Sequence, residues 1–282
     1  MPYKDLMQKH ITPLAPIPTG VEPAGHLRDP VRAVLFDVYG TLFISRSGDI
    51  SLAGREVQTA GRLTSLVQSY DYQGSGDELI DAFFQAIQTS HESMRQQGID
   101  YPEVQIDQIW QQVLGASDIE TARRFAVEFE MIINPGYPMP HLESVLSALR
   151  EASTVIGIVS NAQFFTPILF ETLLGDVPEN IGFDPELIFY SYQYGVAKPS
   201  RHLFQLAAKK LQDYGIAPEN ALYVGNDMLN DMMPAAAEGF QTALFAGDKR
   251  SLRLREDDPD CKGLSPDLVI TDLRELIKQV LK

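Results

Sequence analysis

The chain has 282 residues, 44% of them hydrophobic, and a formal net charge of −15. This length and composition suffice for one large domain or two modest ones with a sizeable core, which excludes a chain that is disordered throughout. The acidic balance argues against general binding to nucleic acid or to an anionic membrane surface. It leaves room for a locally positive pocket that takes a small anionic substrate.

The single cysteine, Cys261, cannot form an intramolecular disulfide, which fits a reducing compartment, so we expect a cytoplasmic protein. Three aspartates close to it in the sequence disfavour a reactive thiolate. No apolar run approaches the roughly 18 residues that a membrane span needs. The first residues lack the basic start and apolar core of a secretory signal. The sequence gives no indication of the oligomeric state.

Residues 1–30 contain five prolines between Pro13 and Pro30 and show little periodicity. The pattern predicts an extended arm lying over the domain, with a flexible tail as the alternative. We favour the arm, because Leu14, Ile17 and Val21 give it apolar surface to bury.

The stretch VRAVLFDVYGTLF, residues 31–43, opens with an apolar run that has no helical spacing. Such a run predicts a strand buried on both faces. It stops at Asp37, and Gly40 and Thr41 follow. Because ligands bind beyond the carboxyl ends of parallel strands, we expect Asp37 at the mouth of a crevice, placed as a nucleophilic carboxylate.

A helical insert is expected after this first strand, over residues 51–135. Its second helix carries apolar residues at helical spacing, and Asp77 is its expected N-cap. Phe83, Phe84, Trp110 and Phe125 are expected in the core of the insert. Hinges are predicted at 44–52 and 135–138, where glycine and proline break the pattern. The four expected helices span 54–70, 77–97, 105–115 and 118–133.

Strands and helices then alternate to the end of the chain, which is typical of a doubly wound, parallel α/β sheet. We therefore assign residues 31–50 and 136–282 to one α/β core. The expected strands are 154–159, 187–190, 221–224, 241–245 and 267–270, and the expected helices are 139–151, 164–174, 200–213, 231–238 and 272–281.

Polar residues follow three of these strands directly. Ser160 and Asn161 offer hydrogen-bond donors for an anionic substrate, although both are also favoured helix caps. Lys198 would offset negative charge beside Asp37, although a lysine in this position is usually solvated. The loop 226–231 supplies oxygen ligands for a hard cation, or acids that favour a helix N-terminus. Thr41 either contacts the substrate or closes the turn after Asp37.

The motifs together resemble those of the haloacid dehalogenase-like hydrolase superfamily. D-V-Y-G-T-L is similar to its motif I, usually hhhhDxDGTL, and I-V-S-N, G-V-A-K-P and G-N-D-M-L-N-D are similar to motifs II, III and IV. The helical insert resembles the type-1 cap of this superfamily. The resemblance implies a Rossmann-like core, with Asp37, Ser160, Asn161 and Lys198 in the active site.

Two positions depart from the phosphatase pattern. Tyr39 occupies the place of the second, acid–base aspartate, as in the 2-haloacid dehalogenases. Asn226 occupies the place of the first acid of motif IV, with Asp227 one residue later. The resemblance implies Mg²⁺ as cofactor, held by Asp37, the backbone carbonyl of Tyr39, and Asn226, Asp227 or both, with Asp231 behind.

Three functions follow. We expect first a Mg²⁺-dependent phosphohydrolase acting on a small phosphorylated metabolite, in which Asp37 attacks phosphorus and Tyr39 is a poor acid–base group. The alternative is a metal-free 2-haloacid dehalogenase, in which the carboxylate attacks carbon and the departing halide needs no proton. A weakly catalytic binding protein of the same fold is the third. A dehalogenase would also need a cap arginine, and the candidates are Arg55, Arg62, Arg95, Arg123 and Arg124.

Overall fold

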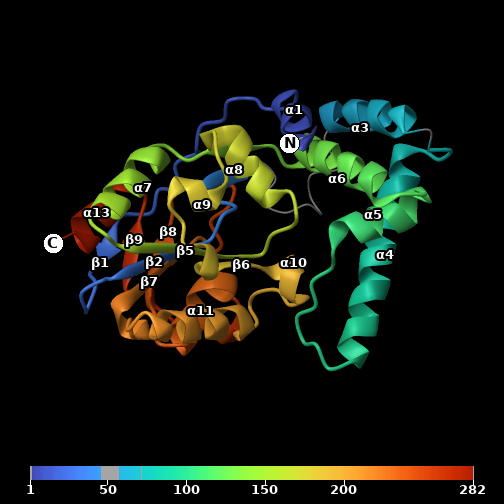
Figure 1. The fold of residues 1–282 in the computed structure, drawn as a ribbon. Coiled ribbons are helices and arrows are strands. Elements are labelled where there is room, and N and C mark those ends of the chain that lie inside the picture. Colours follow the sequence, from blue (N-terminus) through green and yellow to red (C-terminus); the bar gives the residue numbers. More distant parts are fainter. Residues whose placement is uncertain (1, 46–56, 71, 282) are drawn as a thin grey trace.

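A computed structural model describes residues 2–45, 57–70 and 72–281 and shows a seven-stranded sheet flanked by helices (Figure 1). All neighbouring strands are parallel except the edge pair β1–β9. The α/β fold with a mostly parallel sheet is thus confirmed. The spatial order is β1 (Ala24–Gly25), β9 (Leu268–Ile270), β8 (Gln241–Phe245), β7 (Ala221–Gly225), β2 (Ala33–Phe36), β5 (Val155–Ser160) and β6 (Ile188–Tyr190).

Strand β2 lies in the interior of the sheet, between β5 and β7, and all four of its residues are buried. This position explains its unbroken apolar run, because both faces of a central parallel strand are covered. The last residue of β2, Phe36, pairs with Ile158 of β5 and with Val224 of β7. The chain segments that follow these three strands therefore leave the sheet at the same edge.

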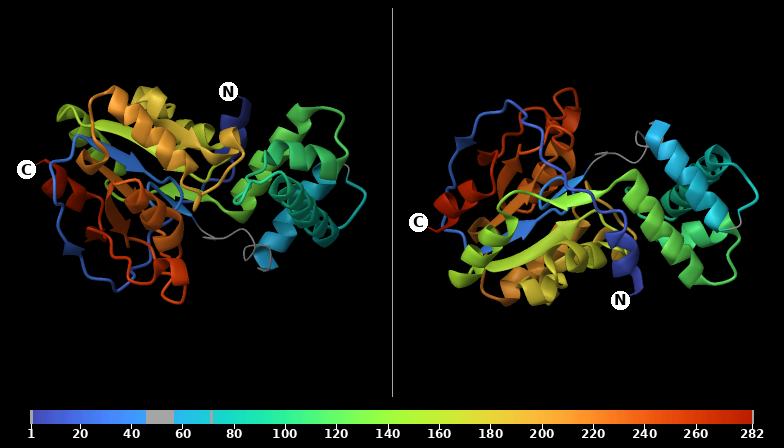
Figure 2. Two further views of the ribbon diagram at one scale, coloured as in Figure 1. Left: turned by 90° about the horizontal axis from the view of Figure 1, so that it is seen from below. Right: turned by 90° about the horizontal axis from the view of Figure 1, so that it is seen from above.

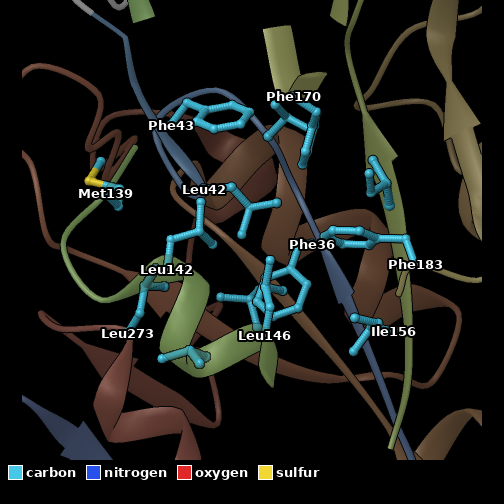
Figure 3. Packing of buried hydrophobic residues seen from close by; sticks show 14 of the residues in the cluster. Phe36, Leu42, Phe43, Met139, Leu142, Leu146, Ile156, Phe170, Phe183 and Leu273 are labelled. Carbon is cyan, nitrogen blue, oxygen red and sulfur yellow. The ribbon is translucent and has the colours of Figure 1, made fainter. Parts of the chain in front are cut away.

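Helices cover both faces of the sheet. On one face lie α7 (Leu142–Glu151), α8 (Thr166–Leu174) and α13 (Arg274–Val280), and their apolar residues share one buried cluster with Phe36. Figure 3 shows part of this cluster, with Leu142 and Leu146 of α7 and Phe170 of α8. The other face is covered by α11 (His202–Asp213) and α12 (Met233–Ala237). Shorter helical segments connect these elements: α9 (Pro178–Ile181), α10 (Ser191–Tyr194), the 3₁₀ turns η1 (Pro185–Leu187), η2 (Pro218–Asn220) and η4 (Pro259–Cys261), and the π-helical turn η3 (Met228–Met232).

The helical insert lies to one side of the core (Figure 2). It consists of α3 (Val57–Ser69), α4 (Gly76–Gln96), α5 (Ile106–Leu114) and α6 (Ile119–Ile133). Two short strands, β3 (Phe43–Ser45) and β4 (Gly136–Pro138), pair antiparallel where the chain leaves and re-enters the core. Most of the expected first hinge and Arg55 lie outside the described residues, and the domain boundaries at 50/51 and 135/136 stay a prediction.

The apolar face of the insert forms its own core. Phe83, Trp110 and Phe125 are buried in it as expected, but Phe84 remains 37% exposed. The N-cap of α4 is Ser75 and not Asp77, because Ser75 and Glu78 form a reciprocal capping box. No helix in the described part of the chain is both long enough and apolar enough to span a bilayer.

The N-terminal segment begins with helix α1 (Pro2–Gln8) and not with extended chain. Its apolar residues explain this difference, because Leu6 and Met7 are buried against the core. The hydroxyl of Tyr3 donates to Glu120 of α6 at 2.6 Å, and its ring contacts Phe164 next to α8. Helix α1 therefore packs against both the insert and the core.

A glycine tests how tightly the centre of the sheet is packed. A Cβ atom at position 157 in β5 would lie 2.6 Å from Leu35 Cδ2 and 2.7 Å from the carbonyl oxygen of Leu187. We expect Gly157→Ala to lower the free energy of unfolding by about 1–3 kcal/mol, measured by urea denaturation. Gly61→Ala in α3 is the control, because a Cβ there meets no atom within 4 Å and a helical alanine should be neutral or stabilising. Equal stability of the two variants would contradict this packing.

Candidate active site

Four segments that are distant in sequence meet at the ammonium group of Lys198. Its Nζ donates to Asp37 Oδ1 at 2.8 Å and to Asp231 Oδ1 at 2.5 Å. It also donates to the hydroxyl of Tyr223 on β7 at 3.0 Å. Tyr223 in turn donates to the carbonyl of Val159 on β5 at 2.8 Å. The loops after β2, α10 and β7 are thus joined through one buried cation.

The three charged groups at this point are all buried: Lys198 is 5% exposed, Asp37 7% and Asp231 1%. Burial alone would lower the pKa of Lys198, but the carboxylates of Asp231 and Asp37 outweigh it, and the pKa is raised. Lys198 is therefore a permanent cation at neutral pH. Burial also raises the pKa of Asp231 to about 6, against the opposing effect of Lys198.

The carboxylate of Asp37 is held at the end of β2 with one oxygen free of hydrogen bonds from the described residues. Its backbone N–H donates to Val224 at 2.9 Å, which fixes the residue at the end of β2. One oxygen accepts from Lys198, and for the other the described residues provide no hydrogen-bond donor. Asp37 lines a cavity of about 490 Å³, which we call the reaction cavity.

Asn161 positions the lysine loop. Its Oδ1 accepts from the backbone N–H of Lys198 at 2.7 Å, and its Nδ2 donates to the Lys198 carbonyl at 3.2 Å. Ser160 lies at the same strand end but is fully buried, and its hydroxyl donates only to the Asn161 carbonyl at 3.4 Å. Of the two residues, Asn161 lines the reaction cavity and Ser160 does not.

Both acids of the loop 226–231 are held by groups of the protein. Asp231 Oδ2 accepts two backbone N–H bonds at 2.9 Å, from Asn226 and Asp227. Asp227 caps the turn that follows, accepting from Leu229 N at 2.9 Å. Both oxygens of Asp227 also accept from Arg255, at 3.1 and 2.7 Å, in a bidentate ion pair.

Asn226 is engaged at both ends of its amide. Its Oδ1 accepts from the hydroxyl of Thr41 at 3.0 Å, and its Nδ2 donates to the carbonyl of Ser251 at 2.6 Å. Thr41 is fully buried and lines neither of the cavities described here, so its observed contact is with Asn226. The Asn226 amide thereby ties the turn after Asp37 to the loop after β8.

The hydroxyl of Tyr39 is poorly suited to act as a general acid or base. Its hydroxyl shares a hydrogen bond of 2.9 Å with Thr166 at the start of α8. Burial, and then the nearby carboxyl of Glu130, raise its pKa far above the ordinary tyrosine value. At neutral pH this phenol neither takes nor gives a proton readily.

These contacts test the expected magnesium ligands. Mg²⁺ is usually bound through one or two carboxylates, waters and substrate phosphates. Both oxygens of Asp227 and both of Asp231 are already engaged, Asn226 is a neutral amide, and Asp37 alone offers a carboxylate oxygen with no partner. The described residues contain no group of three or more His, Cys, Asp or Glu side chains arranged for a metal ion. The side chains present therefore do not fit a magnesium site of the phosphatase pattern.

Arginines that the motifs did not indicate also line the reaction cavity. Arg253 and Arg255 come from the segment after β8, together with Ser251. The alternation in S-L-R-L-R could have indicated them, because a period of two places both arginines on one side of an extended chain. Their distance from the motifs in sequence hid their role.

The candidate cap arginines within the described residues do not supply this charge. Arg62 contacts His10 at 2.8 Å, and Arg123 forms an ion pair with Asp107 at 2.8 Å. Neither these two nor Arg95 and Arg124 line the reaction cavity, and Arg55 lies outside the described residues. The positive charge seen at the site thus comes from Lys198, Arg253 and Arg255 of the core.

A second cavity, of about 320 Å³, lies between the insert and the core. We call it the cap chamber. It shares Tyr39, Asn134 and Asn161 with the reaction cavity, so the two spaces adjoin. Glu130 of α6 lines the chamber and accepts from Asn134 Nδ2 at 3.0 Å. Asn134 accepts from the hydroxyl of Ser45 at 2.9 Å, which links the chamber to the strand β3.

A comparison with known protein families identifies the family of this chain. The family model of haloacid dehalogenase-like hydrolases matches residues 31–239, from the start of the first core strand to the segment after α12. The chain belongs to this hydrolase family and is an enzyme of it. A hydrolase of Schizosaccharomyces pombe, itself described as uncharacterized, is 32% identical over 91 residues. That match covers 30% of this chain and only 36% of the relative.

Solved structures show the same fold. The chain is similar to a 2-haloacid dehalogenase of Pseudomonas syringae, with a TM-score of 0.59 and 16% identity over 89% of this chain and 98% of the other. It is also similar to a phosphatase of the same superfamily from Thermococcus onnurineus, with a TM-score of 0.55 and 18% identity over 88% and 97%. At identities this low, the similarity shows a shared fold and does not identify the reaction.

The buried carboxyl of Glu130 gives a testable pH dependence. Burial raises its pKa from 4.5 to about 7, so the folded chain binds an extra proton between these values. Stability should therefore fall as the pH rises through this window. Glutamine does not titrate, so Glu130→Gln should remove this contribution. Between pH 5 and pH 8 the unfolding free energy of the wild type should therefore fall by about 2–3 kcal/mol more than that of the variant. Exposed Glu92→Gln is the control, and identical pH profiles for Glu130→Gln and the wild type would refute the assignment.

Proposed function

We propose that this hydrolase works without a metal, through nucleophilic substitution by Asp37 at the carbon atom of a small 2-halogenated carboxylate. The observation that carries the proposal is that Asp37 is the one acid of the reaction cavity, among the described residues, with an uncommitted oxygen. The other two acids there, Asp227 and Asp231, are neutralised by Arg255 and Lys198. A nucleophile needs one free oxygen, whereas a magnesium site of the phosphatase pattern would also use oxygens of the loop 226–231, which are engaged by other groups.

The cavity is suited to a monoanion. Three carboxylates line it, and three cations, Lys198, Arg253 and Arg255, line it as well. The chain as a whole carries a charge of −15, so this locally balanced cavity is far less repulsive to an anion than the rest of the surface. Asn134 and Asn161 add amide groups that a carboxylate or a departing halide can contact.

The first step forms an ester. Asp37 Oδ2 attacks C2 of the substrate, the new C–O bond forms as the carbon–halogen bond breaks, and the halide leaves with the bonding electron pair. No proton is needed at the leaving group. This explains why a tyrosine with a hydroxyl bound to Thr166 is tolerated at position 39.

The second step hydrolyses the ester. Water attacks Cγ of Asp37, and negative charge develops on Oδ1, which accepts a hydrogen bond from Lys198 at 2.8 Å. Collapse of this intermediate releases the 2-hydroxy acid and regenerates the Asp37 carboxylate, with one proton passing to solvent. The oxygen in the product comes from Asp37, and the oxygen of water enters Asp37.

The Mg²⁺-dependent phosphohydrolase is our first expectation from the motifs. It requires a general acid for the leaving group and a set of oxygen ligands for the metal, and neither fits the contacts described above. Its leaving group needs an acid, and burial removes Tyr39 from that role. Its metal needs oxygen ligands, and Arg255 and Lys198 occupy the acids of the loop 226–231. We therefore rank it second, with a small phosphorylated metabolite as its substrate.

Chloride release tests the proposal. The wild type should release chloride from 2-chloropropionate, and EDTA should leave the rate unchanged. Asp37→Asn should lower the rate by at least about a thousandfold, because the nucleophile is lost. Exposed Asp257→Asn serves as the control.

Isotope labelling tests the ester intermediate. In a single turnover in H₂¹⁸O, mass spectrometry should find the label in the peptide that contains Asp37. Release of phosphate from p-nitrophenyl phosphate only with Mg²⁺, and no chloride from the haloacid, would establish the phosphohydrolase instead.

A double variant tests why the proposed mechanism needs no metal. Tyr39→Asp with Asn226→Asp adds two carboxylates next to Asp37, and the new carboxylate at position 226 cannot donate to the Ser251 carbonyl. Without a cation these charges repel one another. We expect a lower melting temperature than the wild type, restored by millimolar MgCl₂, and a gain of Mg²⁺-dependent p-nitrophenyl phosphate hydrolysis. Wild-type protein that is stabilised by MgCl₂ to the same extent would contradict the metal-free site.

A further inference from the structure

The cap chamber is an apolar space with aromatic walls. The rings of Phe83 and Trp110 stack at 4.1 Å between centroids, with an interplanar angle of 12°. Phe129 packs against Trp110 at 4.6 Å. Ile87 of α4 and Phe165 from the core add to the apolar lining. These side chains come from the insert and the core together, so the chamber exists only where the two parts meet.

Two polar atoms in the wall of the chamber lack hydrogen-bond partners among the described residues. His91 Nε2 is buried and has none. Glu130 accepts from Asn134 through one oxygen and has no donor at the other. By contrast, the polar neighbours Glu103 and Gln163 are bonded to each other at 3.1 Å. Native interiors leave few buried polar atoms unpaired, so the unpaired His91 Nε2 in an apolar space, with the Glu130 carboxyl in the same wall, indicates a site that a ligand completes.

The size of the chamber limits what the ligand is. An apolar cavity of about 150 Å³ is enough to hold benzene. The chamber has about 320 Å³, far more than the methyl group of a three-carbon acid would fill. A ring fits between such walls, because aromatic pairs gain from stacked and edge contacts. A hydroxyl group on the ring can donate or accept, so it would pair with either unpartnered atom.

We propose that the substrate is a 2-halogenated acid with an aromatic side chain that carries a hydroxyl group, and that this side chain occupies the cap chamber. The inference rests on the proposed function for the position of the carboxylate and C2 at Asp37. Tyr39, Asn134 and Asn161 line both spaces, so a molecule of this kind reaches from one into the other.

Ligand binding tests the chamber without any turnover. Trp110 is the only tryptophan of the chain and lines the chamber, so its fluorescence reports on occupancy. Unreactive acids are titrated into the wild type: propionate, 3-phenylpropionate and 3-(4-hydroxyphenyl)propionate. We expect both aromatic acids to bind at least about tenfold more tightly than propionate, and the hydroxylated acid more tightly than the phenyl acid. Equal affinity for all three acids would overturn the proposal. Equal affinity for the two aromatic acids would overturn the part of the proposal that places a hydroxyl group on the ring.

A matched pair of variants locates the binding. Ile87→Phe places a larger side chain in the chamber and should weaken binding of the aromatic acids roughly tenfold, with propionate changed by less than about twofold. Ile80→Phe makes the same exchange on the same helix, at a partly buried residue that does not line the chamber, and should leave all affinities within about twofold. Equal weakening by both variants would show that the aromatic acids bind elsewhere.

Turnover separates this inference from the proposed function. If the proposal holds, kcat/KM for chloride release is at least about tenfold higher for 2-chloro-3-(4-hydroxyphenyl)propionate than for 2-chloropropionate. Tight binding of the aromatic acids with no chloride release from either substrate would uphold the chamber and refute the dehalogenase. Chloride release from 2-chloropropionate with no advantage for the aromatic acid would uphold the dehalogenase and refute the chamber.

Discussion

The buried ammonium of Lys198 is the interaction on which the site depends. It lies between the carboxylates of Asp37 and Asp231, and its removal would leave both of them as uncompensated buried charges. The parallel sheet makes the arrangement possible, because β2, β5 and β7 end side by side and deliver their loops to one edge. Asn161 holds the backbone of Lys198 from β5, and the hydroxyl of Tyr223 contacts its ammonium from β7. The lysine therefore fixes both the direction of Asp37 and the relative position of the loops.

The insert and the core together form two adjoining spaces, one polar and one apolar. The core supplies the charges around Asp37, and the insert supplies aromatic rings that line the neighbouring chamber. A chain of hydrogen bonds, from Ser45 to Asn134 to Glu130, crosses the boundary beside the β3–β4 pair. Helix α1 contacts both parts as well, through Tyr3. The chamber is thus supported on two sides, and its shape depends on how the insert sits on the core.

Local patterns predicted the sheet and the position of Asp37, because an unbroken apolar run that ends in an acid is typical of a central strand in an alternating α/β chain. They also predicted three buried rings of the insert, Phe83, Trp110 and Phe125, but were wrong about Phe84, which is exposed. Helix α1 was missed, since seven residues give a weak periodic signal and the prolines that follow dominate the segment. Arg253 and Arg255 were missed for a different reason. Their role depends on the contact between the loops after β7 and β8, which no local pattern contains.

The two departures from the phosphatase motifs are physically consistent with each other. An amide at position 226 donates to the Ser251 carbonyl at 2.6 Å and accepts from Thr41 at 3.0 Å, whereas a carboxylate could only accept. An acid there would leave that carbonyl facing a negative charge and would add to the charges of Asp37 and Asp231. A second acid at position 39 would increase the same repulsion. With Tyr39 and Asn226 no further carboxylate joins this cluster, and Lys198 pairs with both Asp37 and the acid behind it. In the proposed mechanism, the neutral residues at both positions act together, because neither adds a charge that a metal would have to balance.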